Sequence, residues 1–203
     1  MDGTEPTTHS GLFKNPFILK ENTRLQAISV REGYPNSFSI STEFRKIPKN
    51  RKAKINTAYS GQYAAGGNIA LIDFIRGGED FRTGSWQGYE GVDVDVVIDF
   101  GTFETITKLS AGFLQDQGSW IFMPEEVSYS ISLDGKSFSP VGIVKNMVSE
   151  KEAGTLVREF ELKMDPQVAG FLHVVAKSRK NCPEWHPGAG KKAWIFCDEI
   201  TVE

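Results

Sequence analysis

The chain has 203 residues, of which 39% are hydrophobic and 24% charged, as in ordinary globular proteins. Residues 1–54 carry ten Lys and Arg against five Asp and Glu, or +5, which leaves thirteen against twenty-one, or −8, for residues 55–203. The acidic larger part argues against a nucleic-acid or anionic-membrane partner held by charge. No apolar run is long enough to span a bilayer, and the length suits two domains of unequal size.

The first domain is predicted over residues 1–46 as a small, partial, immunoglobulin-like sandwich. Asp2-Gly3 is typical of a hairpin turn, and the strand that should precede it is expected to be missing. Short strands are expected in NPFIL (15–19), TRLQAISV (23–30) and SFSISTEF (37–44), the last with Phe38, Ile40, Thr42 and Phe44 at period two. A unit of this size seldom folds alone, so it should lean on a neighbour.

A basic stretch, RKIPKNRKAK, covers residues 45–54. One interpretation is a surface patch for a polyanion, and the other is a solvated linker. The linker interpretation is favoured because no aromatic residue interleaves the charges. Residues 47–54 are therefore predicted as a basic linker between the two domains.

The second domain is predicted over residues 55–203. In VDVDVVIDF, Val92, Val94, Val96, Ile98 and Phe100 alternate with Asp93, Asp95, Val97 and Asp99, which predicts a strand with one buried face. VSYSISLDGKSF repeats this pattern with Val127, Tyr129, Ile131 and Leu133 before a turn at Asp134-Gly135. FLHVVAK and AWIFCDEITV supply later strands. Short strands between Gly-, Pro- and Asp-rich turns are typical of an antiparallel jelly-roll sandwich, and the fold class is all-β.

Two cysteines, Cys182 and Cys197, are too few for a disulfide scaffold or a zinc site. Free thiols are favoured, and one bridge that closes the segment before the last strand is the alternative. No Ser/His/Asp set, phosphate-binding loop or Cys/His metal spacing is visible. Asp93, Asp95 and Asp99 do not form a hydrolytic carboxylate pair, because their spacing places them on the solvent side of one strand.

Three motifs carry a family resemblance: YAAGGNIALIDFIRGGEDFRTGSWQG (63–88), MPEEVSYSISLDGKSF (123–138) and CPEWHPGAGKKAWIFCDEI (182–200). They resemble the discoidin, or coagulation factor V/VIII type C, domain, in the variant found at the C-terminus of bacterial β-hexosaminidases, the chitobiases of Bacteroides. Residues 1–46, through DGTEPT and the strands that follow, resemble the chitobiase C-terminal domain that precedes it. Nothing resembles the catalytic barrel of those enzymes. The resemblance implies a non-catalytic, carbohydrate-binding part of a larger enzyme that is secreted, periplasmic or on the cell surface.

The resemblance also implies a structural calcium ion. Many related domains hold Ca²⁺ in a loop reading Ala-x-x-Asp-Gly-Asn-x-x-Thr, closed by a Glu in the last strand. Here the matching residues would be Asp73, Asp80, Thr83 and Glu199, with extra residues in the loop and Asp80 in the place of Asn. Such a loop can converge the six to eight oxygens that Ca²⁺ requires. The alternative is that Asp73 and Asp80 only cap backbone amides of the loop.

A sugar site needs an aromatic face for the C–H side of a pyranose and polar groups for its hydroxyls. The resemblance places ligands at the loops on one end of the sandwich. The candidates for binding an N-acetylhexosamine- or galactose-containing glycan are Trp120, Phe122, Trp185, His186, Arg76, Glu79 and Arg82. Each Trp could instead be a core residue, and His186 a hydrogen-bonded structural residue. Trp86 and Trp194 are expected to be more buried.

Two other functions remain as alternatives. The domain could be purely structural and pack on the catalytic domain of its parent enzyme. The run Trp120-Ile121-Phe122-Met123 could be an exposed apolar spike that enters membranes, as in the clotting-factor members of the family. The acidic charge of residues 55–203 disfavours this membrane interpretation.

Overall fold

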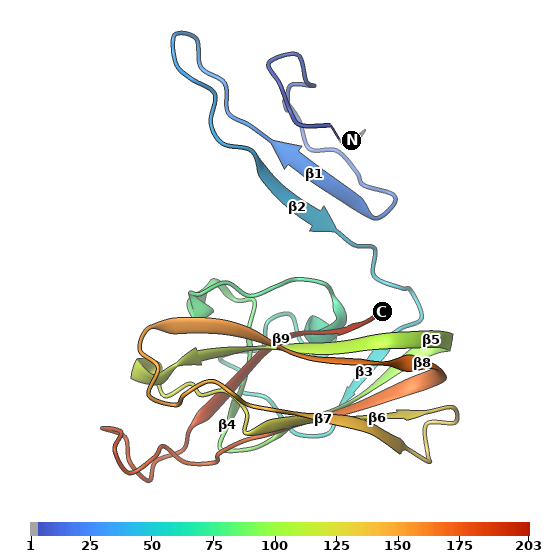
Figure 1. The fold of residues 1–203 in the computed structure, drawn as a ribbon, viewed down its shortest axis with the longest axis vertical. Coiled ribbons are helices and arrows are strands. Elements are labelled where there is room, and N and C mark those ends of the chain that lie inside the picture. The colour runs from blue at the N-terminus through green and yellow to red at the C-terminus, as the bar shows by residue number, and fades with distance from the viewer. Residues whose placement is uncertain (1–3) are drawn as a thin grey trace. The chain divides into compact units, whose positions relative to one another are not determined.

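The computed structural model describes residues 4–203, so the predicted Asp2-Gly3 turn lies outside the described residues. The chain divides into two compact units, with the boundary between Ile47 and Pro48. The first unit contains β1 (Thr23–Ala27) and β2 (Ile40–Phe44), and the second contains every other element (Figure 1).

In the first unit, β1 and β2 pair antiparallel, with Thr23 opposite Phe44. Residues 15–19, predicted as a strand, do not form one. Every residue of β2 is exposed, and Phe38 before it is 96% exposed. A chain this short cannot wrap a second layer over its own apolar side chains, so residues 4–47 form one two-stranded sheet where a small sandwich was expected.

The second unit is the predicted jelly-roll sandwich, with all named strands antiparallel to their partners in the order β4-β9-β5-β8-β6-β7 and β3 added beside β5. Its strands are β3 (Lys52–Ile55), β4 (Gln87–Glu90), β5 (Val94–Asp116), β6 (Glu126–Ser132), β7 (Ser139–Lys145), β8 (Thr155–Lys177) and β9 (Trp194–Val202). Three short 3-10 helices, η1 (Ala70–Ile72), η2 (Phe81–Thr83) and η3 (Gln117–Ser119), lie in the connections.

The two long strands, β5 and β8, run through both layers of the sandwich (Figure 1). Pairing between them is interrupted after Asp99 and resumes at Glu104. Gly101 in this interruption has φ 71°, and a Cβ there would lie 2.4 Å from the Cβ of Asn50. Before the interruption β5 pairs with β3, and after it β5 pairs with β9. One strand can therefore contribute to two facing sheets around a common core.

The predicted alternation in β5 is confirmed. Val94, Val96, Ile98 and Phe100 are at most 1% exposed and belong to the main core with Tyr129 of β6. The intervening aspartates lie outside, where each is hydrogen-bonded: Asp93 to Ser178, Asp95 to His173, and Asp99 to Gly101. The prediction for Leu133 is wrong, because it follows the end of β6 and is 60% exposed.

The basic stretch is not simply a linker. Lys52, Ala53 and Lys54, predicted as linker, belong to β3 and pair with β5. Arg51 is buried, and its guanidinium lies 2.8 Å from both carboxylate oxygens of Glu104. Pairing with β5 therefore gives part of this stretch a structural role in the sandwich.

Both cysteines are free and buried, so the disulfide alternative is wrong. Cys197 lies in the main core, whereas Cys182 packs in a smaller cluster with Phe122 and Ala193. Burial raises the pKa of both thiols, which disfavours the reactive thiolate. No helix within residues 4–203 is long and apolar enough to cross a membrane.

Candidate functional site

A cavity of about 430 Å³ lies where three connections of the sandwich meet. The β5–β6 connection carries η3 and Trp120, the β8–β9 connection carries Trp185, and Gly154 comes from just before β8. The two tryptophans thus lie on separate loops, 65 positions apart in sequence, and line one cavity. The lining residues are Asp116, Gln117, Gly118, Trp120, Gly154, Trp185, His186 and Pro187.

Trp120 is held in an unusual backbone conformation. It ends η3 with φ 66°, a left-handed geometry that costs a non-glycine residue about 1–3 kcal/mol. Its carbonyl accepts from the amide of Trp194 in β9, at 2.9 Å, which offsets part of that cost. At Gly188 a Cβ would lie 2.9 Å from the Trp120 ring, so a side chain at this position would displace the indole. The half-buried indole is therefore fixed in place.

Trp185 is 38% exposed and is anchored by its ring nitrogen. Its Nε1 donates to Oε1 of Glu150 at 2.5 Å, and Arg179 donates to the other oxygen of the same carboxylate. The Trp185 and Arg179 hydrogen bonds hold the pKa of Glu150 below its usual range, so the acceptor stays ionised at neutral pH. Glu150 and Arg179 were not among the predicted site residues. No sequence signal marks them, because Glu150 lies 35 positions from Trp185.

His186 serves as a structural hydrogen-bonding residue. Its Nδ1 accepts from the amide of Gly188 at 3.0 Å, so Nε2 carries the proton and donates to the carbonyl of Gln117 at 2.8 Å. Both ring nitrogens are therefore occupied, and the imidazole is 6% exposed. His186 lines the cavity, so its contact with sugar stays a prediction. Its two hydrogen bonds also give it a positioning role, because they tie η3 to the loop of Trp185.

Phe122 is 1% exposed, and its prediction as a sugar platform is wrong. The ring packs 5.5 Å from the His186 ring and beneath the guanidinium of Arg179. Its neighbours Ile121 and Met123 are 1% and 3% exposed. The run from Trp120 to Met123 therefore contains no exposed apolar spike, and the membrane-insertion hypothesis loses the feature that motivated it.

The charged candidates of the first long loop have other contacts. Arg76 lies 2.7 Å from Glu159 of β8 and 3.4 Å from Asp198 of β9, where it ties the loop to the sheet. Arg82 lies over the ring of Phe81 and contacts Asp80. Glu79 is exposed. None of the three lines the cavity with Trp120 and Trp185.

The predicted calcium residues divide into two pairs. Glu199 is completely buried, with Oε2 accepting from the amide of Phe74 at 2.6 Å and Oε1 without a hydrogen-bond partner. Desolvation by burial raises the pKa of Glu199 to about 8. The hydrogen bond from Phe74 opposes this shift, and the negative charge of Asp73 adds to it. Asp80 instead caps η2 by accepting from the Arg82 amide.

Thr83 donates to the carbonyl of Asp80 at 2.9 Å. Within residues 4–203 no group of three or more His, Cys, Asp or Glu side chains is arranged to hold a metal. A buried carboxylate with a free oxygen beside a second carboxylate nevertheless fits a cation that takes its remaining ligands from the backbone.

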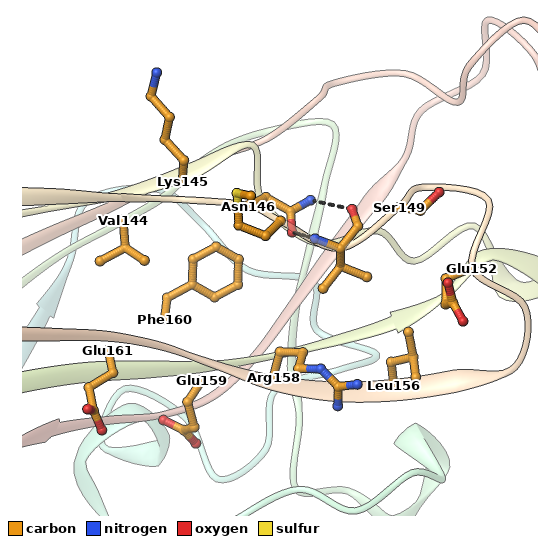
Figure 2. Close-up of a pocket in the computed structure, with 12 residues that line it drawn as sticks. Val144, Lys145, Asn146, Ser149, Glu152, Leu156, Arg158, Glu159, Phe160 and Glu161 are labelled. Carbon is orange, nitrogen blue, oxygen red and sulfur yellow. Dashed lines mark hydrogen bonds between the residues drawn. The ribbon is translucent and has the colours of Figure 1, made fainter.

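A second cavity, of about 640 Å³, lies between the β7–β8 connection and the first half of β8 (Figure 2). Asn146 exchanges hydrogen bonds with the backbone of Val148 at its wall, and Arg158 and Glu159 lie along β8. Its only aromatic lining residue, Phe160, is 4% exposed and belongs to the core. The larger cavity therefore lacks an accessible aromatic face, and the smaller one is the candidate sugar site.

The bent strands and shared core identify the second unit as a discoidin-like jelly-roll β-sandwich. Comparison with solved structures agrees: a fucolectin from the striped bass Morone saxatilis has the same fold, with a TM-score of 0.51 and 16% identity over 77% of this chain and 47% of that chain.

Two further solved structures are similar at lower TM-scores. The family 32 carbohydrate-binding module of Clostridium perfringens NanJ, solved with galactose, has a TM-score of 0.46 and 16% identity over 77% of this chain and 96% of that chain. The C-terminal domain of a Bacteroides fragilis chitobiase has a TM-score of 0.44 and 16% identity over 78% of this chain and 95% of that chain. The family model described as Fn3 associated matches residues 1–44. No curated protein matches the sequence.

Proposed function

We propose that the second unit is a non-catalytic carbohydrate-binding module, and that the cavity between Trp120 and Trp185 is its sugar site. The observation that carries the proposal is the convergence of two partly exposed indoles, from separate loops, on one cavity. Aromatic faces of this kind pack against the C–H side of a pyranose, and the loop ends of a rigid sandwich are the usual position for binding residues.

The proposed parent protein is a secreted, periplasmic or cell-surface glycoside hydrolase of the β-hexosaminidase type. The three discoidin-like motifs support this, as does the fact that one similar structure is a chitobiase domain. The proposed ligand is a galactose- or N-acetylhexosamine-containing glycan, and the module would keep the parent's catalytic domain near such a polymer. Tethering raises the local substrate concentration without contributing to the chemical step.

Calcium is proposed as a structural ion beside Asp73 and Glu199. The orphaned Oε1 of Glu199 supports this site, because a bound cation would satisfy the oxygen and neutralise the buried charge. When bound, Ca²⁺ would tie the loop after η1 to β9. Asp80 and Thr83 are left with the capping role that they have in η2.

A structural role is a second candidate for the first unit. Leu12, Phe13, Ile18 and Phe38 are each more than 70% exposed, and a folded unit seldom leaves so many apolar side chains in water. Packing on another domain of the parent protein would cover them. This role is compatible with sugar binding by the second unit.

A glycan array probed with the intact chain tests the main proposal. We expect selective retention on one sugar class, with affinities of single sites in the millimolar to micromolar range, and no release of nitrophenol from an aryl N-acetylglucosaminide. Hydrolysis at a rate typical of enzymes would contradict the non-catalytic assignment. Absence of binding to every glycan would contradict the sugar site.

A further inference from the structure

Two lysines lie over the two tryptophans of the candidate sugar site. Nζ of Lys191 is 5.4 Å from the ring centroid of Trp120, and Nζ of Lys151 is 5.7 Å from that of Trp185. Both distances are within the range of cation–π attraction. The lysines come from two different connections, β8–β9 and β7–β8, and each lies over a different tryptophan.

Two carboxylates of the site and its surroundings already have partners. Asp116 accepts from the amide and the hydroxyl of Ser119, and Glu150 accepts from Trp185 and Arg179. In the described part of the chain, neither Lys151 nor Lys191 forms an ion pair within 4 Å. Two exposed cations that form no ion pair within 4 Å therefore lie over the tryptophans of the site, on a domain whose residues 55–203 sum to −8. Glu184, next to Trp185, and Glu152, next to Lys151, are the exposed carboxylates in the two loops that carry these lysines.

A neutral sugar and an anionic sugar would use this arrangement differently. A neutral pyranose that stacks on the ring face covered by the lysine must displace the ammonium group and forfeit its attraction to the indole. An anionic pyranose stacks in the same way, but the displaced lysine can follow its carboxylate or sulfate and form a charge-assisted hydrogen bond. The two lysines thus favour a negative charge at the edge of the sugar.

We propose that the cavity between Trp120 and Trp185 selects an anionic glycan, a sugar bearing a carboxylate or a sulfate, through Lys151 and Lys191. This inference rests on the proposed function, since it specifies the ligand class of the same site. A uronic acid and a sulfated sugar both supply an anionic group on a pyranose, and the experiment below distinguishes between them.

The test titrates the intact chain with matched sugars by NMR. The probes are galactose, glucose and N-acetylglucosamine, each compared with its 6-sulfate, and galacturonate and glucuronate compared with their methyl esters. We expect an anionic member to bind at least about five-fold more tightly than its neutral counterpart, and 0.5 M NaCl to reduce this preference. The sulfate and uronate arms show which anion is preferred.

Substitutions assign the preference to the two lysines. K151M and K191M should each reduce affinity for the best anionic sugar by about three-fold or more, with little effect on its neutral counterpart. E184Q should raise affinity for the anion only, and K136M, in the exposed β6–β7 turn, is the matched control that should change nothing.

The outcomes separate the two proposals. Binding of neutral sugars as tightly as their anionic counterparts, or an anionic preference that survives in K151M and K191M, overturns the selection by lysines and leaves the sugar site standing. Failure of every probe, together with a blank glycan array, overturns the sugar site itself.

Discussion

The stability of the metal-free protein should fall as pH rises from 6 to 8, because of Glu199. Burial raises the pKa of this carboxyl from 4.5 to about 8, so the folded state holds its proton more tightly than the unfolded chain does. The resulting stabilisation of the folded state is fully present below pH 4.5, the pKa of Glu199 in the unfolded chain, and is lost as pH rises to about 8. Each pH unit between the two pKa values lowers the free energy of unfolding by about 1.4 kcal/mol. The loss is therefore at most about 5 kcal/mol in total, and about 2–3 kcal/mol between pH 6 and 8.

Urea unfolding in chelator at pH 6, 7 and 8 measures this effect. Burial raises the pKa of the neighbouring Asp198 to about 6, so most of its own pH-dependent contribution to stability is lost below pH 6. E199Q removes the ionisation while keeping the shape of the side chain, so its pH slope should be shallower than that of the wild type. Added Ca²⁺ should stabilise the wild type most at pH 8, where the carboxylate is ionised, and E199Q much less. A wild-type slope equal to that of E199Q, or no effect of Ca²⁺ at pH 8, would refute the reasoning.

Three further substitutions test the packing around the site. Phe122→Ala should lower the free energy of unfolding in urea by about 3–5 kcal/mol, because the ring is 1% exposed, and a loss below about 1 kcal/mol would contradict its burial. His186→Ala removes the hydrogen bond to Gln117, so it should cost about 1–3 kcal/mol and also weaken glycan binding; unchanged binding would exclude a positioning role. Gly77→Ala places a Cβ 2.1 Å from the Trp86 ring and should lower the melting temperature by several degrees, whereas an unchanged melting curve would refute this close approach.

Patterns local in sequence were the most predictable. The alternation from Val94 to Phe100 predicted a buried face, because strand geometry alone decides which side chains share a side. Trp86 was also correctly expected to be buried, and its Nε1 donates to the carbonyl of Gly78 in the same loop. In the first unit, the period-two pattern predicted a strand over residues 37–44, and β2 covers residues 40–44 of it. The buried face that such a pattern indicates is missing, because β2 has no second layer against it.

The charged and aromatic site candidates were less predictable, because their roles depend on distant partners. Arg76 contacts Asp198, 122 positions away, and nothing near either residue in the sequence indicates that pair. Phe122 and Trp120 are two positions apart in one apolar run, yet the first is in the core and the second lines the cavity. The difference comes from the left-handed turn at Trp120, which only the folded loop reveals.

The central claim is tested most directly by the affinity of Trp120→Ala and Trp185→Ala for the best glycan from the array. Loss of one stacking face should cost about 1–3 kcal/mol, or roughly five- to a hundred-fold in affinity, with a fall of only a few degrees in melting temperature because both indoles are partly exposed. Phe103→Ala, which removes a 64% exposed aromatic ring that does not line the cavity, is the matched control and should bind normally. Unchanged affinity in both tryptophan variants would contradict the assignment of the sugar site.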